Sequence, residues 1–538
     1  MRFLKQPEIK EWYEDGVTLS FETSLPCTCR IIYGWVEYDS TIISLSRAVN
    51  HTVRLTGLQP ATIYHYQIIC SDGLEELNLS GSFVTRSFSD AKISVFFNGG
   101  TRGSAVIQSA VGQQDLYRKF IECVEAAEHS IDFCFMKLTH KDVQEALLQA
   151  FERGVKVRFI CEEDEAGSEE VLILKELGIP VLTDCSGANQ GKGIMHHKFA
   201  IFDHRDRSSL DDDRVWTGSF NPTDYGQFPQ PNENVVLIED AALAAIYTAG
   251  FEIMWGSDRD SPDTEYALFE AGAFNQLPHK VMTGETLIEV FFSPEGDAGV
   301  AIETALRSVD HSLAFCMYSF TRSTLANAII DLAHIQDINI RGLLDSRQIE
   351  ADGIYSQWDR LSASSEQIRK YIEGPLLHHK YAIIDAMYDS SDPTVITGSY
   401  NWTSSAEVRN NENVILIHNA EIAELYRHEF EARYDERTQR IDNPLPLCWR
   451  LDSNFPNPFN VETLVSFELP KPSHVVLSVV DVLGRSVRTL LNQHCGAGNR
   501  RVEWDGRNDE GRLVSNGVYL IRLISSEYSD QIKAVFMK

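Results

Sequence analysis

The chain has 538 residues, of which 43% are apolar and 23% are charged, and its formal net charge is −30 at pH 7. Beyond roughly 300 residues a single core stops growing, so we expect several domains. The negative charge argues against a general binder of polyanions, because Lys and Arg must outnumber carboxylates wherever phosphates dock. No apolar run reaches the roughly 18 residues of a membrane span, and residues 1–7 lack the apolar core of a signal peptide.

Residues 1–88 are predicted to form an all-β sandwich. Residues 17–23 alternate apolar and polar side chains, as a half-buried strand does, and further strands are predicted at 31–34 and 63–69. The stretch 53–64 resembles the corner of fibronectin type III domains, in which a tyrosine hydroxyl ties a loop to a strand. It contains no catalytic cluster, so we expect a structural or adhesive role.

The ten cysteines are spread thinly along the chain. Cys27 and Cys29 are the closest pair and lie in a predicted strand. There is no C-x2-C pair, so no zinc site is expected. Cys134, Cys161 and Cys316 lie inside apolar strands and are expected to be buried free thiols.

From residue 92 the pattern changes to alternating strands and helices. The predicted elements are strands at 93–97, 131–135 and 155–160 and helices at 116–127 and 141–153. This β-α-β order predicts an α/β layer with a mostly parallel sheet.

The same order returns 182 residues later, where His311 to Cys316 repeats the pattern of His129 to Cys134. The middle of the chain is therefore predicted to be two homologous α/β halves, at 92–260 and 286–440, joined by a linker at 261–285. A repeat of this length indicates duplicated domains rather than a solenoid.

Residues 446–538 revert to predicted strands, the clearest of which are 475–480 and 518–523, with turn-rich stretches between them. Together with the opening stretch 454–460, they look like the immunoglobulin-like fold of flagellar hook-capping proteins and of C-terminal domains appended to secreted bacterial proteins. This resemblance implies a bacterial protein with an extracellular or cell-surface location.

The most informative stretch of the chain occurs twice. Residues 194–203 and 376–385 each contain the pattern H-x-K-x4-D, and each is followed by Gly-Ser-x-Asn and then by Asn-Glu-Asn. The candidate site residues are His196, Lys198, Asp203, Ser219, Asn221 and Glu233 in the first copy and His378, Lys380, Asp385, Ser399, Asn401 and Glu412 in the second. One such motif is weak evidence, but two copies with the same downstream elements in the same order are hard to attribute to chance.

These residue types suit a phosphodiester if the two halves meet face to face. The lysines can neutralise non-bridging oxygens, and the asparagines can donate further hydrogen bonds. One neutral histidine can attack phosphorus, while the other, protonated, gives its proton to the leaving oxygen and then activates water. Glu233 and Glu412 are candidates to hold the second nitrogen of each imidazole. No metal or cofactor is expected, because the lysines and an imidazolium supply the positive charge.

The two motifs resemble the signature of the phospholipase D superfamily, which is complete in both halves. The resemblance implies metal-independent, in-line attack by the histidine of the first motif, so His196 is expected to be the nucleophile and His378 the acid. It also implies that Asp203 and Asp385 are structural. Ser219 and Ser399 are expected to line the phosphate site.

The stretch 397–403, followed by 410–413, looks like the compact bacterial endonuclease branch of that superfamily and the related mitochondrial lipid/RNA hydrolases. Members of this branch usually pair two chains, whereas here one chain supplies both half-sites, so we expect a monomer without an integral membrane segment.

Three functions therefore stay open. The preferred one is a nuclease-like phosphodiesterase, the first alternative is hydrolysis of phospholipid headgroups, and the second is a surface-binding scaffold with a vestigial site. Nucleic acid would require a locally basic groove, with Arg102, Lys137, Lys192 and Arg322 as candidates, whereas a wide apolar mouth would favour lipid.

Overall fold

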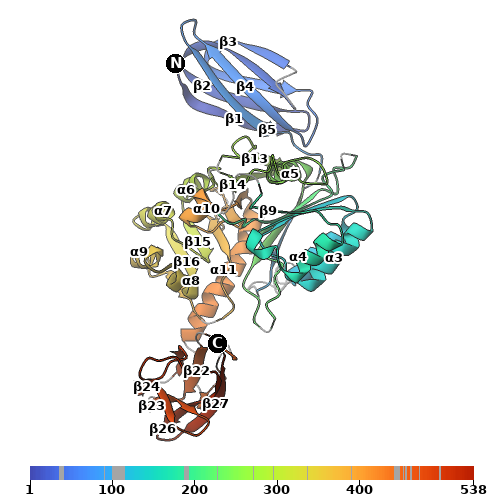
Figure 1. The fold of residues 1–538 in the computed structure, drawn as a ribbon. Coiled ribbons are helices and arrows are strands. Elements are labelled where there is room, and N and C mark those ends of the chain that lie inside the picture. Colours follow the sequence, from blue (N-terminus) through green and yellow to red (C-terminus); the bar gives the residue numbers. More distant parts are fainter. Residues whose placement is uncertain are drawn as a thin grey trace. The chain divides into compact units, whose positions relative to one another are not determined.

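The computed structural model describes residues 1–537 apart from short segments, which are residues 36–40, 90, 100–114, 187–192, 207, 227, 271, 295, 336, 373, 389, 442–448, 452–453, 455–456, 461–462, 472 and 496–497. The chain divides into two compact units, Met1–Arg437 and Thr438–Lys538. Figure 1 follows the first unit from an all-β part (blue) into two α/β parts (cyan to orange).

The N-terminal part consists of strands β1 (Phe3–Tyr13), β2 (Gly16–Gly34), β3 (Thr41–Thr56), β4 (Ile63–Ser71) and β5 (Glu76–Val84). All five are connected by antiparallel pairing, in the order β1-β2-β4-β5 with β3 also paired to β2. Alternate residues of β2 are buried, as the sequence predicted. The Tyr64 hydroxyl accepts a hydrogen bond from the Gln59 amide at 2.9 Å, which ties a loop to β4.

The first α/β half contains strands β6 (Lys92–Phe97), β7 (Ser130–Phe135), β8 (Lys156–Cys161), β9 (Val181–Thr183), β10 (Lys198–Phe202), β11 (Arg214–Gly218) and β12 (Asn234–Glu239). Its helices are α2 (Leu116–Ala126), α3 (Lys141–Glu152), α4 (Glu169–Glu176) and α5 (Ala241–Trp255), with a short 3-10 turn at Glu163–Glu165. The strand order is β6-β12-β11-β10-β7-β8-β9, which places the first H-x-K-x4-D strand, β10, at the centre.

The second half repeats this arrangement with strands β13 (Lys280–Thr283), β14 (Thr286–Ser293), β15 (Ser312–Met317), β16 (Asn339–Asp345), β17 (Ile368–Tyr371), β18 (Lys380–Ile384), β19 (Thr394–Gly398) and β20 (Glu412–His418). Its helices are α6 (Ala298–Arg307), α7 (Ser323–Ala333), α8 (Ser346–Asp352), α9 (Trp358–Ser364), α10 (Ser404–Val408) and α11 (Ala420–Ile441), with a 3-10 turn at Gly353–Tyr355. The order β13-β14-β20-β19-β18-β15-β16-β17 again puts the motif strand, β18, inside the sheet.

The prediction of a mostly parallel sheet is wrong. Only β7-β8-β9 and β15-β16-β17 pair in parallel, and the other pairs among the described strands are antiparallel. The physical reason lies in the connections between strands. Helices connect the parallel strands, whereas the described residues between β10 and β11 and between β11 and β12 form no helix.

A shared core joins the two halves. It contains Phe199 and Ile201 from β10, Ile383 from β18 and Phe292 from β14, together with side chains of α5 and α11. Nearly every residue of α5 is buried, which is expected of a helix that is apolar on all sides. Burial at this scale fixes how the sheets face each other, and so fixes how the two motifs meet.

The second unit is an all-β part with strands β21 (Arg450–Leu451), β22 (Thr463–Leu469), β23 (Ser473–Asp481), β24 (Ser486–Cys495), β25 (Gly498–Trp504), β26 (Gly517–Ser525) and β27 (Ser529–Phe536). They form two sheets, β21-β22-β25 and β24-β23-β26-β27, whose inward side chains share one core. None of the helices in the described part of the chain is both long and apolar enough to span a bilayer.

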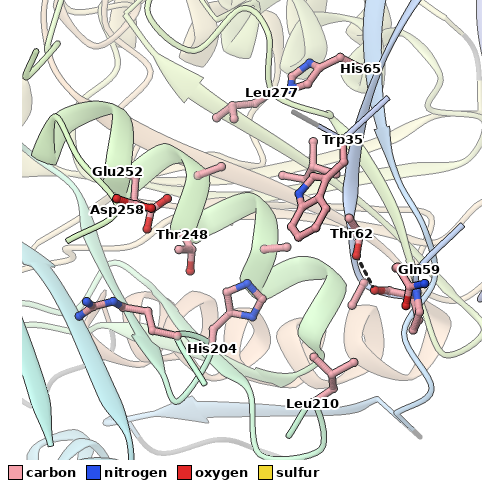
Figure 2. Close-up of a pocket in the computed structure, with 16 residues that line it drawn as sticks. Trp35, Gln59, Thr62, His65, His204, Leu210, Thr248, Glu252, Asp258 and Leu277 are labelled. Carbon is pink, nitrogen blue, oxygen red and sulfur yellow. Dashed lines mark hydrogen bonds between the residues drawn. The ribbon is translucent and has the colours of Figure 1, made fainter. Parts of the chain in front are cut away.

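A cavity of about 930 Å³ lies between the N-terminal β part and α5 (Figure 2). Its lining includes Thr62 and His65 on one side and His204, Thr248 and Glu252 on the other. The residues that line it include none of the twelve candidate site residues.

Candidate functional site

Each motif histidine is held by a glutamate from the opposite half. His196 Nδ1 lies 2.7 Å from Glu412 Oε2, and His378 Nδ1 lies 2.8 Å from Glu233 Oε1. All four side chains are buried or nearly so. A carboxylate at Nδ1 fixes the imidazole orientation and favours the tautomer with a free Nε2, so each half-site is completed by the other.

Main-chain hydrogen bonds between the halves hold each motif histidine next to the glutamate of the other half. The His196 amide donates to the Asn411 carbonyl at 2.9 Å, and the Asn232 amide donates to the Leu376 carbonyl at 2.7 Å. The residue before each histidine therefore forms a parallel bridge with the residue before the opposite glutamate, Met195 with Asn411 and Leu377 with Asn232. These two bridges place the histidine and glutamate of different halves side by side.

Each lysine is the first residue of a motif strand, β10 or β18, and lies two residues after the motif histidine. Lys198 Nζ donates to the His196 carbonyl at 2.9 Å, and Lys380 Nζ donates to the His378 carbonyl at 2.7 Å. An ammonium group has three donors, so each lysine retains donors for an anion beyond this bond.

Burial and like charges perturb the site electrostatically. Burial lowers the pKa of Lys198 to about 8 and that of Lys380 well below its usual range, and the neighbouring Lys198 adds to the second shift. Burial raises the pKa of Glu233 to about 8. Perturbed pKa values of this kind cluster at functional sites.

Both motif histidines have a lowered pKa. Burial is the main cause for His196, where the Glu412 carboxylate opposes it. For His378 the pKa is lowered well below its usual range by burial and then by Lys380 and Lys198. The charges that act on each histidine therefore come from both halves, as its glutamate contact does.

The Gly-Ser-x-Asn segments bring the asparagines to the ends of β11 and β19. Gly218 and Gly398 have φ angles of 155° and 142°, and a Cβ on either would lie 2.2 or 2.3 Å from a main-chain oxygen of the neighbouring strand. Only glycine fits there without strain. Next to them, Asn221 Oδ1 and Asn401 Oδ1 are buried and find no hydrogen-bond partner in the part of the chain that the structure describes.

The serine hydroxyls of these segments bond to the main chain of their own half. The Ser219 and Ser399 hydroxyls are fully buried and each accepts a hydrogen bond from a main-chain amide, that of Asn234 or Asn413, at 3.0 Å. They brace neighbouring strands within their own half. Their expected role in lining a phosphate site stays a prediction.

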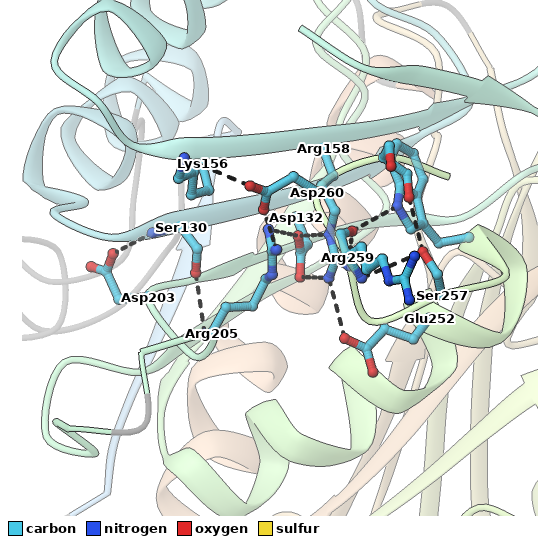
Figure 3. A network of polar contacts seen from close by, with 12 residues as sticks. Ser130, Asp132, Lys156, Arg158, Asp203, Arg205, Glu252, Ser257, Arg259 and Asp260 are labelled. Carbon is cyan, nitrogen blue, oxygen red and sulfur yellow. Dashed lines mark hydrogen bonds and ion pairs between the residues drawn. The ribbon is translucent and has the colours of Figure 1, made fainter. Parts of the chain in front are cut away.

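The motif aspartates also bind the main chain. Asp203 Oδ1 accepts from the amides of His129 at 2.7 Å and Ser130 at 3.1 Å, and Asp385 accepts from the equivalent amides in the second half. Figure 3 shows the bond between Asp203 and Ser130 at one side and, in the middle, the ion pair between Arg158 and Asp132, which links β8 to β7. The hydrogen bonds of the two aspartates hold the end of each motif strand against the start of the neighbouring strand, β7 or β15.

His197 and His379, which follow the motif histidines, are fully buried. His197 packs among phenylalanine rings, and burial lowers its pKa to about 3. His379 instead bonds Asn234 Oδ1 at 3.1 Å and Glu429 Oε1 at 3.0 Å. The position equivalent to Glu429 in the first half is Gly250, so this buried histidine–glutamate contact exists in one half alone.

Two carboxylates near the motifs were missed as functional residues by the sequence reasoning. Glu162 Oε2 accepts from the Met195 amide at 2.5 Å, and Asp345 Oδ2 accepts from the Leu377 amide at 2.9 Å. Each supports the residue before a motif histidine. Their signal in the sequence is only their position at the end of equivalent strands.

Two of the four residues suggested for a basic groove are described, and both are ion-paired. Lys137 Nζ lies 3.0 Å from Glu165 Oε2, and Arg322 Nη1 lies 2.6 Å from Glu407 Oε2. Arg102 and Lys192 lie outside the described residues.

Two equivalent α/β halves, joined so that each completes the other's histidine–glutamate pair, define a two-half enzyme-like site. Residues 120–255 and 302–434 match the family described as "Cardiolipin synthase, PLD-like domain", and the matches together span half of the chain. The chain therefore belongs to this family of phospholipase D-like domains, which confirms the resemblance seen in the motifs. Residues 456–528 match the FlgD Ig-like domain.

Individual relatives match parts of the chain. The mitochondrial cardiolipin hydrolase of Xenopus laevis is 31% identical over 141 residues, which are 26% of this chain and 63% of that protein. A phospholipase D of Rickettsia prowazekii (strain Madrid E) is 28% identical over 27% of this chain and 67% of its own length. The crystal structure of a phospholipase D family member, Nuc from Salmonella typhimurium, is 29% identical, with 28% of this chain and 95% of that chain covered and a TM-score of 0.25.

Proposed function

We propose that the chain is a phosphodiesterase that acts through a covalent phosphohistidine intermediate. The observation that carries the proposal is the pair of histidine–glutamate contacts that cross between the halves, at 2.7 and 2.8 Å. Two oriented imidazoles beside two buried lysines supply a nucleophile, an acid and the positive charge that a phosphodiester requires.

In the proposed reaction, His196 Nε2 attacks phosphorus and the bond to the leaving oxygen breaks. His378 gives its Nε2 proton to that oxygen. A water molecule then passes a proton to His378 and attacks phosphorus, which breaks the bond to His196 and restores both imidazoles. Lys198 and Lys380 neutralise the non-bridging oxygens throughout, and Asn221 and Asn401 donate to them through their amide groups.

The assignment of the acid has an electrostatic basis. The charges of Lys380 and Lys198 contribute to the low pKa of His378. A bound phosphodiester offsets those charges and so raises the pKa of His378 toward the range in which it carries a proton. At His196 the Glu412 carboxylate opposes the lowering of the pKa by burial. The contact of Glu412 with Nδ1 also orients this imidazole as the nucleophile.

For the substrate we propose nucleic acid. The ring of Tyr318 is half-buried, its centroid is 5.0 Å from that of His378, and Lys380 Nζ lies 4.9 Å from it. An aromatic face beside the reacting group can stack on an unpaired base. The resemblance of residues 397–403 to the endonuclease branch points the same way.

Hydrolysis of a phospholipid headgroup is the second candidate, because the relatives that match include proteins named cardiolipin hydrolase and phospholipase D. The ion pairs of Lys137 and Arg322 also reduce the free positive charge available to a polynucleotide. A vestigial site is disfavoured, since both halves retain the histidine, lysine, asparagine and glutamate.

A side-by-side assay on single-stranded DNA, duplex DNA, RNA and phosphatidylcholine or cardiolipin vesicles separates these candidates. We expect the highest kcat/KM on a single-stranded nucleic acid, with a loss on Tyr318→Ala and little loss on Met136→Ala, the equivalent position of the first half. Faster turnover of lipid than of any nucleic acid would overturn the substrate assignment while leaving the phosphodiesterase intact.

A further inference from the structure

A buried cluster of sulfur and imidazole lies in the N-terminal β part, far in sequence from both motifs. Cys27 and Cys29 are on β2, His51 is on β3 and Cys70 is on β4. All four are at most 3% exposed. Cys29 stands directly opposite Cys70 in the antiparallel pair and forms a disulfide with it.

The third sulfur and the imidazole lie against this disulfide. Cys27 Sγ is 3.6 Å from Cys29 Sγ, and His51 Nε2 is 3.7 Å from Cys27 Sγ and 3.6 Å from Cys29 Sγ. Residues two apart on a strand share a face, so the Cys-x-Cys spacing brings both sulfurs to the same side. Three groups that commonly bind metal ions therefore converge on one point.

These distances match the edges of a zinc coordination sphere. A tetrahedral zinc ion with bonds of about 2.3 Å to sulfur and about 2.05 Å to nitrogen holds its ligand atoms about 3.5–3.8 Å apart. The three measured separations fall in this range. A reduced Cys70 would supply the fourth ligand from the opposing strand.

The surroundings of His51 also suit a ligand. The His51 ring bonds to the Ala48 backbone. Because Nε2 faces the sulfurs, we assign this bond to Nδ1; a histidine that ligates a metal usually donates its other nitrogen in this way. Phe21 stacks on the ring with centroids 4.8 Å apart, which fixes its plane.

We propose that Cys27, Cys29, Cys70 and His51 form a Cys3His zinc site when the cysteines are reduced, and that the Cys29–Cys70 disulfide is its oxidised alternative. A dithiol reductant supplies two electrons and two protons to the disulfide and becomes a disulfide itself. Zinc then displaces three thiol protons to solvent and binds three thiolates and a neutral imidazole. The same four residues thus exist in two states, set by the redox conditions around the protein.

The test uses the full chain, prepared with a phosphine reductant and metal-free buffer and then given Zn²⁺ or Co²⁺. We expect about one tightly held zinc per reduced chain, and the visible bands of tetrahedral Co²⁺ together with thiolate charge-transfer absorption. Protein oxidised with diamide should bind neither metal at this site.

Variants assign the ligands. Cys27→Ser and His51→Ala should lose the zinc and the cobalt bands, whereas the control Cys123→Ser, which changes a buried free cysteine of α2, should keep both. If a variant does not fold, the comparison of reduced and oxidised wild-type protein still decides. Equal metal content in the reduced and oxidised protein, or no tetrahedral cobalt spectrum in the reduced one, would overturn the proposal.

Discussion

Replacing Glu412 by glutamine tests whether the histidine of one half depends on the glutamate of the other. Glu412 and His196 are both buried and their contact is 2.7 Å long. A hydrogen bond to a charged group contributes about 1.5–3 kcal/mol, and each 1.36 kcal/mol is a factor of ten in rate. If the contact matters as much in the transition state, Glu412→Gln lowers kcat/KM by roughly 10- to 150-fold.

The pH profile of the same variant reports the role of His196. The Glu412 carboxylate raises the pKa of His196, so glutamine lowers it. A nucleophile must be neutral, and its deprotonation produces the acidic limb of the kcat/KM profile; that limb should therefore move to lower pH. If His196 were the acid, the alkaline limb would move instead.

Glu233→Gln is the matched control, because it removes the partner of the other imidazole. It should lower kcat/KM but leave in place the acidic limb, which reports His196. The assay is hydrolysis of bis(p-nitrophenyl) phosphate, with circular dichroism to verify folding. A Glu412→Gln protein that is folded and keeps both its rate and its profile would refute the cross-half dependence.

The remaining predictions concern stability and metal dependence. Asp203→Asn weakens the hydrogen bonds from the main-chain amides of His129 and Ser130. It should lower the free energy of unfolding in denaturant by about 1–3 kcal/mol and keep kcat within a few-fold. A large fall in kcat at unchanged stability would instead show that the aspartate is catalytic. Glu429→Gln removes the buried carboxylate that contacts both Arg433 and His379 and should cost about 3–5 kcal/mol, and an unchanged unfolding midpoint would contradict this. EDTA should leave the initial rate unchanged because the lysines supply the positive charge, and a loss that a divalent cation restores would contradict that account.

The sequence predicted the parts of the site whose signal is local. The two motifs, the duplicated halves and the Asn-Glu-Asn segments all appear as short, repeated patterns, and in the structure His196 contacts Glu412 and His378 contacts Glu233 across the halves. Asp203 was expected to be structural, and it binds main-chain amides. Strand and helix positions in the first half were also close, since α2 ends one residue before its predicted limit.

Features that depend on how elements dock could not be predicted. Which glutamate serves which histidine follows from the bridges between Met195 and Asn411 and between Asn232 and Leu377, and no spacing in the chain encodes that crossing. The sheet direction was mispredicted for a related reason. An alternation of strands and helices in the sequence predicts crossover connections and hence parallel strands. The antiparallel strands β11 and β12 follow β10 through loops, and loops leave no such pattern in the sequence.

The cysteine cluster shows the same limit. The absence of C-x2-C led to the expectation of no zinc site, yet Cys27 and Cys29 share a face with His51 and Cys70, which are brought in by two other strands. The extracellular or cell-surface location, the fibronectin-like character of the N-terminal part and the monomeric state stay predictions.

The most direct measurement of the central claim is mass spectrometry, at alkaline pH, of protein quenched with base and denaturant during hydrolysis of bis(p-nitrophenyl) phosphate, because a phosphorus–nitrogen bond is labile in acid. With one shared site, an aryl-phosphoryl group should be found on His196 and should accumulate in His378→Ala, because p-nitrophenolate leaves without an acid but water still requires a base. His196→Ala should carry none and should not turn over. Sustained turnover by both folded variants, or an adduct-free wild type and His378→Ala, would contradict a mechanism shared between the two halves.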